Sequence, residues 1–411
     1  MDSINIISPN QKIEGYSQAQ LGDIWWQTVY ELPADQHFGR FDDNKDLRGK
    51  RGSVEKSQIA QPDQSPAFFI GGAFGDLITG VGGISQINRT IILPNKGNTT
   101  VFFPILNATA NNLTNDISTI NPEDPFSNGN RTVEQLKEQA AFFSNPIAQG
   151  GLVSDLFAMV DRKKINNPFA YRQASENPFS YTPPKNNILE EDLGYTENTY
   201  LANPEYDPNF PTLKELGGFG KVEISPEVAN GYWLAVKVAG GDHTLNFGGT
   251  FTVGGEPFFS LDITYNILNQ VLGTRKNDHL QGTQGNDYID GGKGKDYLFG
   301  LNGEDLLVAG DGNDVINGGR GNDELWGDAG KDLFIFKPGY GADNIFDFEH
   351  GEKIDISAFK IQDLSKIGKT DITLESKLDT TQIDLGGGNQ LILVGIAAQE
   401  VAISRNTITL I

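Results

Sequence analysis

The chain has 411 residues, a formal net charge of −22 at pH 7 and no cysteine. Its length allows two or three domains, and its acidity argues against nucleic acids and anionic membrane surfaces as partners. Without cysteine, disulfides, thiolate metal sites and thiol catalysis are excluded. The start of the chain lacks the basic and apolar regions of a cleavable secretory signal. No apolar run approaches the ~18 residues of a transmembrane helix, so we expect no transmembrane segment.

The first predicted elements are helices. Ser17 and Gln20 form a capping-box pattern, and apolar residues follow at helical spacing until Pro33 ends the run. A second helix is predicted to begin at the similar pair Thr132 and Gln135. A third helix is predicted from the spacing of Val153, Leu156, Phe157 and Val160.

Six strands are also predicted within residues 1–268, where apolar residues alternate or run together between turn residues. They cover residues 67–72, 89–94, 100–106, 231–238, 242–249 and 257–268. The closing strands alternate like those of one sheet of a β-sandwich. Residues 108–215 are rich in Asn, Pro and Asp and predict long loops. We therefore expect an α+β domain with a β-sandwich core.

Seven consecutive nine-residue units occupy residues 273–335. Each has an aspartate at its sixth position and an apolar residue at its eighth, and glycine fills the first position in six units and the fourth in six. The glycine-rich part favours a tight turn with positive φ, and the last three residues favour a short strand. Two units would form one coil of a parallel β-roll around a thin apolar core. The aspartates are Asp278, Asp287, Asp296, Asp305, Asp314, Asp323 and Asp332.

The aspartates of stacked turns would lie along two edges of this roll. Stacked carboxylates repel one another, and a hard divalent cation removes that repulsion. Ca²⁺ tolerates an irregular cage of carboxylate and carbonyl oxygens better than Mg²⁺ does. The pattern therefore predicts calcium binding, and its alignment over seven units disfavours a flexible linker. One edge would carry Asp278, Asp296, Asp314 and Asp332, and the other Asp287, Asp305 and Asp323.

The seven units resemble the repeats-in-toxin (RTX) nonapeptide, a calcium-binding repeat. In that family each ion is held between the aspartates of units n and n+2, together with carbonyl oxygens of the same turns. The resemblance implies about five complete sites, with partial sites at the ends. Lys276 replaces the fourth-position glycine of the first unit, which we therefore interpret as a capping unit. The implied pairs are 278/296, 296/314, 314/332, 287/305 and 305/323.

The segment after the repeats, residues 336–359, resembles the one that closes RTX rolls in secreted bacterial proteases and lipases. The residues that match its pattern are Asp343, Ile345, Asp347, Phe348, Gly351, Ile354 and Asp355. Short alternating runs follow, and we expect antiparallel strands there that supply the last apolar surface of the roll. These runs lie at residues 371–375, 380–387, 389–396 and 406–411.

The whole chain is thus expected to be mainly β, with an N-terminal domain at 1–268, the RTX roll at 272–335 and a β cap at 336–411. RTX proteins leave bacteria through a type I (ABC) exporter that reads an uncleaved C-terminal signal, which this resemblance places at residues 404–411. Extracellular calcium modules bind at roughly 10⁻⁴–10⁻³ M. The repeats are therefore expected to stay unfolded in a low-calcium cytosol and to fold outside, in a secreted, extracellular or cell-surface bacterial protein.

The N-terminal domain lacks two common catalytic motifs. It contains neither H-E-x-x-H nor G-x-S-x-G, which argues against a metalloprotease and a lipase. His37 lies near Asp35, Asp42 and Asp43, which is one arrangement for acid–base or metal chemistry, but a solvated loop is the favoured interpretation. His243 enters a predicted strand, where a structural hydrogen bond is expected.

Two further groups have similar alternatives. The adjacent acids Glu190, Glu191 and Asp192 are interpreted as a solvated loop rather than a glycosidase pair. Tyr232 and Trp233 are interpreted as core residues of a strand rather than a sugar-binding surface. The sequence therefore indicates no catalytic residue.

The N-terminal domain also resembles a set of secreted bacterial proteins of unassigned activity. The resemblance rests on Trp25 and Trp26 and on the segments 97–107 and 241–248, and it implies no particular chemistry. The favoured function is non-enzymatic binding of a surface glycan, a matrix component or another copy of the chain. The alternative is a secreted hydrolase with a carboxylate-based site, which would require two carboxylates, or a carboxylate and a histidine, in one cleft.

Overall fold

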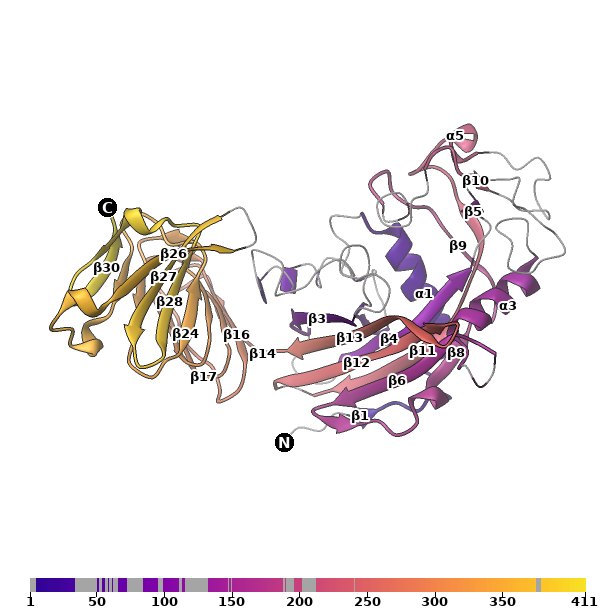
Figure 1. The fold of residues 1–411 in the computed structure, drawn as a ribbon, viewed down its shortest axis with the longest axis horizontal. Coiled ribbons are helices and arrows are strands. Elements are labelled where there is room, and N and C mark those ends of the chain that lie inside the picture. The colour runs from indigo at the N-terminus through magenta and orange to yellow at the C-terminus, as the bar shows by residue number, and fades with distance from the viewer. Residues whose placement is uncertain are drawn as a thin grey trace.

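The protein, seen in a computed structural model, has two β-rich regions along its longest axis (Figure 1). The first is a β-sandwich with helices, and the second is a β-roll with an antiparallel cap. β13 (Glu256–Ile267) and β14 (Asn269–Thr274) carry the chain from one region to the other. No helix in the described part is long and apolar enough to cross a membrane. The structure describes residues 5–33, 50–51, 54–55, 58, 61, 66–71, 84–94, 99–110, 113–114, 132–146, 148, 150–187, 189, 196–201, 212–239, 241–374 and 378–411.

Two sheets form the sandwich. One has the order β1-β11-β4-β2, with β8 and β9 also paired to β11, and the other has the order β3-β13-β12-β6-β7. The strands of the first sheet are β1 (Asn5–Ile6), β2 (Phe68–Phe69), β4 (Thr99–Ala110), β8 (Arg172–Ala174), β9 (Phe179–Tyr181) and β11 (Ile224–Val238). Those that join β13 in the second sheet are β3 (Ile84–Ile91), β6 (Val153–Val160), β7 (Lys163–Lys164) and β12 (His243–Val253). β5 (Leu113–Thr114) and β10 (Tyr200–Leu201) form a separate pair.

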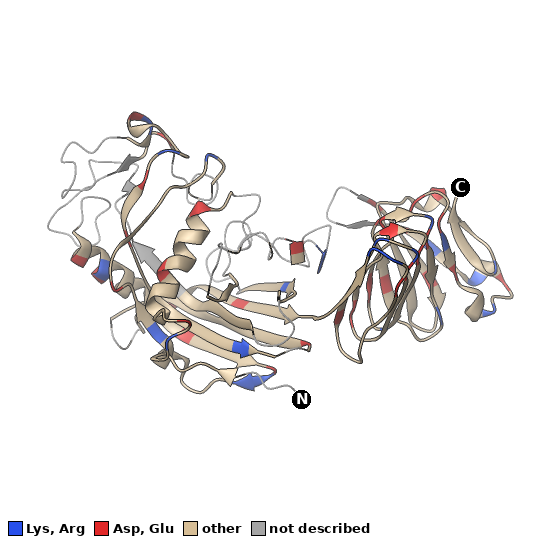
Figure 2. Cartoon of the chain, turned by 180° about the vertical axis from the view of Figure 1, so that it is seen from behind, with Lys and Arg blue, Asp and Glu red and all other residues tan. Residues whose placement is uncertain are grey.

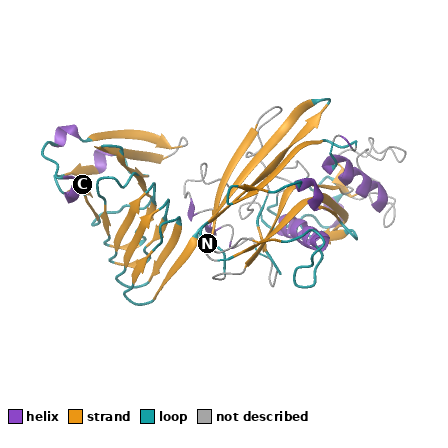
Figure 3. Cartoon of the chain, turned by 90° about the horizontal axis from the view of Figure 1, so that it is seen from below, coloured by secondary structure: helices purple, strands orange, loops and turns teal. Residues whose placement is uncertain are grey.

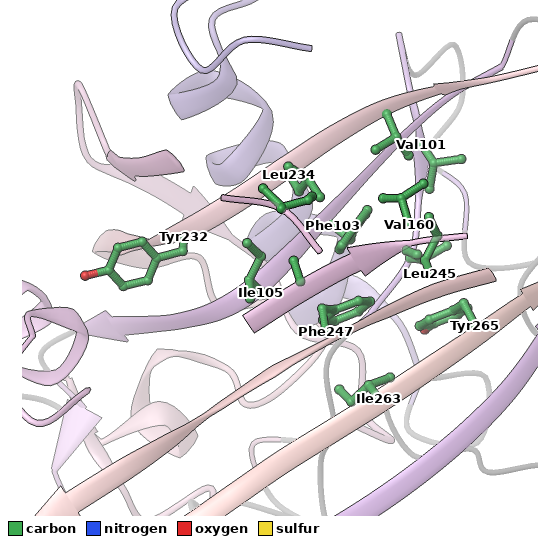
Figure 4. Close-up of a cluster of buried hydrophobic side chains, with 14 of the residues drawn as sticks. Val101, Phe103, Ile105, Val160, Tyr232, Leu234, Leu245, Phe247, Ile263 and Tyr265 are labelled. Carbon is green, nitrogen blue, oxygen red and sulfur yellow. The ribbon is translucent and has the colours of Figure 1, made fainter. Parts of the chain in front are cut away.

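The main core of this region lies between the two sheets. Phe103 and Leu234 from the first sheet point toward Phe247 and Ile263 from the second (Figure 4). The ring centroids of Phe103 and Phe247 are 4.5 Å apart. Alternate residues of each strand face the opposing sheet and are buried there. The β-sandwich core predicted for the N-terminal region is therefore present.

A second core lies on the outer face of the first sheet, under α1 (Gln18–Glu31). The rings of Trp25 and Trp233 are 5.5 Å apart, and Phe102 stacks on Trp233 at 5.3 Å. Tyr232 and Trp233 belong to opposite cores, and each is 1% exposed. The interpretation of both aromatic residues as core is therefore confirmed, and β11 is buried on both faces.

The first two predicted helices are confirmed, including their caps. Ser17 and Gln20 form the capping box of α1, and Thr132 and Gln135 form that of α3 (Val133–Ser144). Each N-cap hydroxyl accepts a hydrogen bond from an N–H of the first turn, which would otherwise have no partner within the helix. α3 packs through Leu136 against the first sheet. A four-residue helix, α5, spans Leu213–Leu216.

The third predicted helix is wrong, because Val153–Val160 forms strand β6. A register shift opposite Thr250 and Phe251 leaves Ser154 without a partner residue in β12. This bulge places Val153 and Leu156 on the same buried face although they are three residues apart. The buried residues of this strand thus have the spacing expected for one face of an amphipathic helix.

Two further expectations are corrected, one about which strands share a sheet and one about loops. β12 and β13 are neighbours in one sheet, but β11 lies in the opposite sheet. Alternation along a strand reports that one face is buried and does not identify the neighbouring strand. The prediction of long loops across residues 108–215 is wrong where α3, β6, β8 and β9 occur.

The β-roll contains two sheets whose parallel strands come from alternate units (Figure 3). Tyr288 pairs with Leu306 in one sheet and Tyr297 with Val315 in the other, so coils repeat every 18 residues. One sheet contains β14, β16 (Asp287–Gly292), β18 (Leu306–Val308), β21 (Glu324–Trp326) and β24 (Ala342–Ile345). The other contains β15 (His279–Gln281), β17 (Tyr297–Asn302), β20 (Val315–Arg320), β23 (Leu333–Ile335) and β25 (Lys353–Asp355). A small third sheet pairs β19 (Asp311–Gly312) with β22 (Ala329–Gly330).

The core of the roll is formed by the eighth-position side chains of the units. The buried members of this set are Ile289, Leu298, Leu307, Ile316, Leu325 and Phe334. Leu280 of the first unit is only partly buried against them. The predicted coil of two units around a thin apolar core is confirmed, and the chain is mainly β as expected.

Antiparallel strands close the roll. The cap contains β26 (Gly368–Leu374), β27 (Leu378–Gly386), β28 (Asn389–Val394), β29 (Val401–Ile403) and β30 (Thr407–Leu410). β28 adds to β24 in parallel and then pairs with β27 in the antiparallel sense, while β30 pairs antiparallel with β25. Ile383, Leu391 and Ile408 continue the core of the roll. The strands predicted after the repeats are therefore confirmed.

The two regions share a small apolar contact. Its buried residues come from the N-terminal region and from β18 on the outer surface of the roll. They are Val54, Ile92, Leu268, Leu306 and Val308.

Candidate metal centre

The repeat aspartates form two stacks, one on each edge of the roll. Each stack follows a series of turns 18 residues apart, and acidic residues are frequent along this region (Figure 2). Six of the seven side chains are buried, and Asp278 of the first unit is half-buried. The buried members are Asp287, Asp296, Asp305, Asp314, Asp323 and Asp332.

Backbone hydrogen bonds connect successive aspartates in each stack. The N–H of Asp278 donates to Oδ1 of Asp296 at 2.7 Å, and the N–H of Asp287 donates to Oδ1 of Asp305 at 2.9 Å. The same bond recurs from Asp296 to Asp314, from Asp305 to Asp323 and from Asp314 to Asp332. The Oδ1 atom of each later aspartate is thus occupied, and its orientation is fixed.

The second carboxylate oxygen of these later aspartates has no hydrogen-bond donor. The Oδ2 atoms concerned are buried, and they belong to Asp296, Asp305, Asp314, Asp323 and Asp332. A buried carboxylate oxygen without a partner is costly, because it has lost its water without gaining a replacement. These oxygens therefore provide the chemistry that a hard cation needs.

Backbone carbonyls lie beside the unpaired oxygens. A Cβ atom placed on Gly300 would lie 2.2 Å from both Asp305 Oδ2 and the Gly318 carbonyl oxygen. On the other edge, a Cβ on Gly291 would lie 2.4 Å from the Ala309 carbonyl oxygen and 3.0 Å from Asp296 Oδ2. At these first positions, glycine lets the carboxylate of its own unit and a carbonyl from two units later approach the same place.

The donor set suits calcium more than a transition metal. Within the described ranges, no group of three or more His, Asp or Glu side chains gathers as a metal-binding cluster. A cation in either stack would therefore take its remaining ligands from backbone carbonyls. Ca²⁺ accepts mixed carboxylate and carbonyl oxygens in flexible geometry, whereas zinc sites use nitrogen and sulfur ligands.

The electrostatics of the stacks also favour a cation. Burial, followed by the charge of Asp323, raises the pKa of the Asp305 carboxyl to about 8. Burial raises the pKa of Asp314 and that of Asp323 to about 6. The ionised carboxylates are thus destabilised at neutral pH, and a bound divalent cation would reverse this by stabilising the charged form.

The first aspartate of each stack differs from the others. Asp278 Oδ2 accepts hydrogen bonds from the N–H and the hydroxyl of Thr274 at 2.7 and 2.8 Å. Asp287 Oδ2 accepts equivalent bonds from Thr283 at 2.6 and 3.1 Å. Threonine therefore closes the first turn of each stack without a cation. For the first unit, this arrangement agrees with its interpretation as a cap.

Two carboxylates beyond the repeats extend the stacks, and the repeat pattern did not predict them as site residues. Asp343 Oδ1 accepts a hydrogen bond from the N–H of Asp323 at 3.2 Å. The pairing of β23 with β25 places Glu352 beside Asp332, and both added carboxylates are 1% exposed. Each lies 20 residues after its neighbour in the stack, so neither follows the nine-residue period. The sequence pattern of residues 336–359 includes Asp343, and it was the one sequence feature that pointed to either carboxylate.

Among the N-terminal histidine and carboxylate candidates, His243 lies within the described residues. His243 Nδ1 lies 3.0 Å from Asp161 Oδ2, which confirms the expected structural hydrogen bond. His37 and its neighbours Asp35, Asp42 and Asp43 lie outside the described residues, as do Glu190, Glu191 and Asp192.

A different acidic pair consists of Asp23 on α1 and Glu176, which follows β8. Ser175 donates to Asp23 Oδ1 at 2.5 Å, and Ser17 donates to Glu176 Oε1 at 2.8 Å. Burial, and to a smaller extent the charge of Glu176, raises the pKa of Asp23 to about 7, while the bond from Ser175 opposes this shift. The sequence contained no motif that would bring these two acids together.

Comparisons with known proteins match the repeat region. A family model described as the RTX calcium-binding nonapeptide repeat, in four copies, matches residues 272–307 and 299–334. The solution structure of the AlgE6R3 subunit from the Azotobacter vinelandii mannuronan C5-epimerase is 29% identical over 31% of this chain and 76% of that chain, with a TM-score of 0.14. The comparison with curated proteins gives no match. The family match spans the coils that carry both aspartate stacks.

Proposed function

Residues 272–334 are RTX calcium-binding nonapeptide repeats, and we propose that their sixth-position aspartates hold Ca²⁺ between successive coils. The observation that supports this assignment is the set of five buried Oδ2 atoms without a donor. Each belongs to the later aspartate of one of the pairs 278/296, 296/314, 314/332, 287/305 and 305/323. We infer five sites from these pairs, each completed by carbonyls of the adjacent turns.

Calcium binding and folding of the roll are one event in this proposal. Without a cation, folding would bury ionised carboxylates against one another, which opposes the gain from burying the thin apolar core. With Ca²⁺ bound, the same carboxylates become ligands and the coils can stack. The chain is thus a calcium-dependent folding unit joined to a β-sandwich.

Secretion by a type I (ABC) exporter is part of the same proposal. The assigned signal, residues 404–411, contains β30, and Ile408 in this strand is fully buried in the cap. An exporter can read such a segment only while the cap is unfolded. A low-calcium cytosol would keep the roll open, and extracellular calcium would then fold it. This reasoning supports a secreted bacterial protein.

For the N-terminal sandwich we propose a non-enzymatic binding role toward a surface glycan, a matrix component or another copy of the chain. The second candidate is a hydrolase, and the pair Asp23 and Glu176 is the observation that favours it. Release of sugar from a panel of polysaccharides, compared between the native protein and Asp23→Asn, separates these roles. Retention on the polysaccharide without release supports binding, and release that is lost in the variant supports hydrolysis.

The calcium proposal is tested by hydrogen exchange of the full chain in calcium-free buffer, in millimolar Ca²⁺ and in millimolar Mg²⁺. Amide protection across residues 272–335 should rise with Ca²⁺ and not with Mg²⁺, while the sandwich strands remain protected throughout. Full protection of the repeats in calcium-free buffer, unchanged by Ca²⁺, would overturn the proposal that calcium folds them.

A further inference from the structure

The outer face of the second sheet carries a partly exposed aromatic ring among small polar side chains. Phe247 and Ile263 point into the core between the sheets (Figure 4), so the alternate residues Asn246, Gly248 and Asp262 face outward. In the described part of the chain, α1 and α3 pack against the first sheet. The outward side chains at the middle of β6, β12 and β13 are half-buried or exposed, and a ligand can reach them.

The aromatic ring on this face is Phe157, which lies beside a glycine inside the neighbouring strand. Phe157 is opposite Gly248, and Gly248 is opposite Asp262, so the three form one row across β6, β12 and β13. A Cβ atom on Gly248 would lie 3.1 Å from Cζ of Phe157 and 1.9 Å from the Leu261 carbonyl oxygen. A glycine inside a strand often marks such a close approach. The ring thus packs on the backbone of the sheet, and as a half-buried side chain it leaves part of its surface to solvent.

Hydrogen bonds fix the polar side chains around this ring. The Asn246 amide donates to Oδ1 of Asp262 at 2.6 Å and to Oγ1 of Thr264 at 3.0 Å. The hydroxyl groups of Thr250 and Ser260 are 2.8 Å apart. Asn246 pairs with Thr264 and Thr250 with Ser260, so these polar pairs occupy the two rows that flank the row of the ring. Hydrogen-bonding groups are therefore held in place on both sides of the aromatic surface.

The charge of this face restricts the partners that fit it. The one Lys or Arg in β3, β6, β12 and β13 is Arg89, which is buried. An anionic polysaccharide would meet no cation on these strands and would be repelled by a chain with a net charge of −22. The core of a protein interface is larger and more apolar than Phe157 and Met159 together provide. An uncharged sugar is complementary, because its C–H groups pack on an aromatic ring while its hydroxyl groups exchange hydrogen bonds at the rim.

We propose that this face binds an uncharged polysaccharide, with Phe157 as the stacking surface and Asn246 and Asp262 among the hydrogen-bonding groups. This inference rests on the proposed binding role of the sandwich, to which it assigns a surface and a class of ligand. A sugar ring packs on Phe157, and its hydroxyl groups bond to the side chains of the flanking rows. α1, which carries Asp23, packs on the other sheet, so binding at this face does not require the acidic pair of the hydrolase candidate.

Native affinity electrophoresis of the full-length chain in millimolar Ca²⁺ tests this site. The gels contain hydroxyethyl cellulose, galactomannan or dextran as uncharged probes, or polygalacturonate as an anionic probe. At least one uncharged probe should retard the native protein, and F157A should weaken that retardation at least about tenfold in apparent Kd. Y16A is the matched control, because Tyr16 is a 42% exposed aromatic residue next to α1 on the other sheet, and it should match the native protein.

Two further variants separate loss of the ring from loss of folding. F157Y keeps a flat ring and should keep the retardation, whereas F157L keeps an apolar side chain of similar burial and should lose it. Retardation by an uncharged probe that is unchanged in F157A and F157L would overturn this face as the site and leave the binding role of the sandwich intact. Retardation by polygalacturonate alone would overturn the uncharged class of ligand. If no probe retarded the native protein, both this inference and the proposed glycan-binding role would fail.

Discussion

Arg51 donates hydrogen bonds to both carboxylate oxygens of Asp328, at 2.8 and 3.2 Å. Its guanidinium also lies 4.6 Å from the centre of the Trp326 ring. Asp328 and Trp326 belong to the last two repeat units, whereas Arg51 belongs to the N-terminal region. The nearby backbone N–H of Lys50 donates to the Glu324 carboxylate at 2.7 Å. The contact between the two regions therefore uses side chains that have these positions only when the roll is folded.

Replacing Arg51 with alanine should weaken this contact only when calcium is present. A charged contact with two hydrogen bonds contributes about 1.5–3 kcal/mol to stability. Lysine cannot replace it, because its ammonium group lacks the planar pair of donors of the guanidinium. In Ca²⁺, thermal unfolding of R51A and of R51K should therefore begin several degrees below that of the native chain. In calcium-free buffer the variants and the native chain should coincide. Arg320→Ala, at an exposed arginine of the roll, is the control, and an equal effect of R51A in both buffers would contradict the link.

Asparagine at Asp305 should raise the calcium concentration needed for folding more than asparagine at Asp278. Asp305 belongs to two of the proposed sites and is fully buried. Asp278 belongs to one, and Thr274 already occupies its Oδ2 atom. We expect a midpoint shift of about tenfold for D305N, or ~1.4 kcal/mol, and a smaller shift for D278N. Circular dichroism against free Ca²⁺ measures both, and equal shifts would contradict the assigned pairs.

The calcium-free roll should become more stable as the pH falls. The folded-state pKa is about 8 for Asp305 and about 6 for Asp314 and Asp323, whereas an unfolded aspartate titrates near ~3.9. The folded form therefore binds more protons than the unfolded form between these values, and stability falls as pH rises. The contribution is fully present below about pH 4 and is lost progressively up to pH 8.

Circular dichroism in calcium-depleted buffer checks this dependence. The β-signal of the native chain should increase on acidification from pH 8 to pH 5.5, and D305N should show a smaller change because one of the titrating groups is absent. Saturating Ca²⁺ should remove the dependence over the same range, since the bound ion keeps the carboxylates charged. A calcium-free spectrum that is independent of pH in this range would show that carboxylate charge does not limit folding.

His243→Ala should destabilise the sandwich without changing the response of the roll to calcium. The imidazole Nδ1 is 3.0 Å from Asp161, and the same carboxylate accepts the Thr244 N–H at 3.0 Å. Loss of the largely buried ring would remove its packing and a hydrogen bond to a carboxylate that is 40% exposed, at a cost of about 1–3 kcal/mol. Urea unfolding of the sandwich measures this loss. His279→Ala, at an exposed histidine of the first repeat, should leave sandwich unfolding unchanged.

The features that could be predicted from the sequence were local or periodic. The capping box of Ser17 and Gln20 involves residues three apart and needs no distant partner. The eighth-position residues, such as Leu307 and Ile316, recur at a fixed interval, so their common burial in the roll follows from the period alone. The same period identified the repeat aspartates, because every coil adds an equivalent carboxylate to one of two edges.

The features that could not be predicted depend on irregular or distant pairing. Ser154 bulges from β6 because of its register with β12, and this bulge made a strand resemble a helix. Glu352 lies 20 residues from Asp332 and is a glutamate, so neither its spacing nor its type follows the repeat. Arg51 meets Asp328 across 277 residues of sequence, and no local pattern encodes such a contact.

The cap also limits the length of the β-array. Identical coils stacked in parallel offer an open row of N–H and C=O groups at each end, on which a further coil from another molecule could add. Here β25 is covered by β30 and β28 by β27, both in the antiparallel sense, and the outermost strand of one sheet, β29, has only three residues. The reversal of strand direction removes the template for another coil. The cap thereby protects the C-terminal end of the roll against the addition of coils from other molecules. The repeats alone would not limit the number of stacked coils.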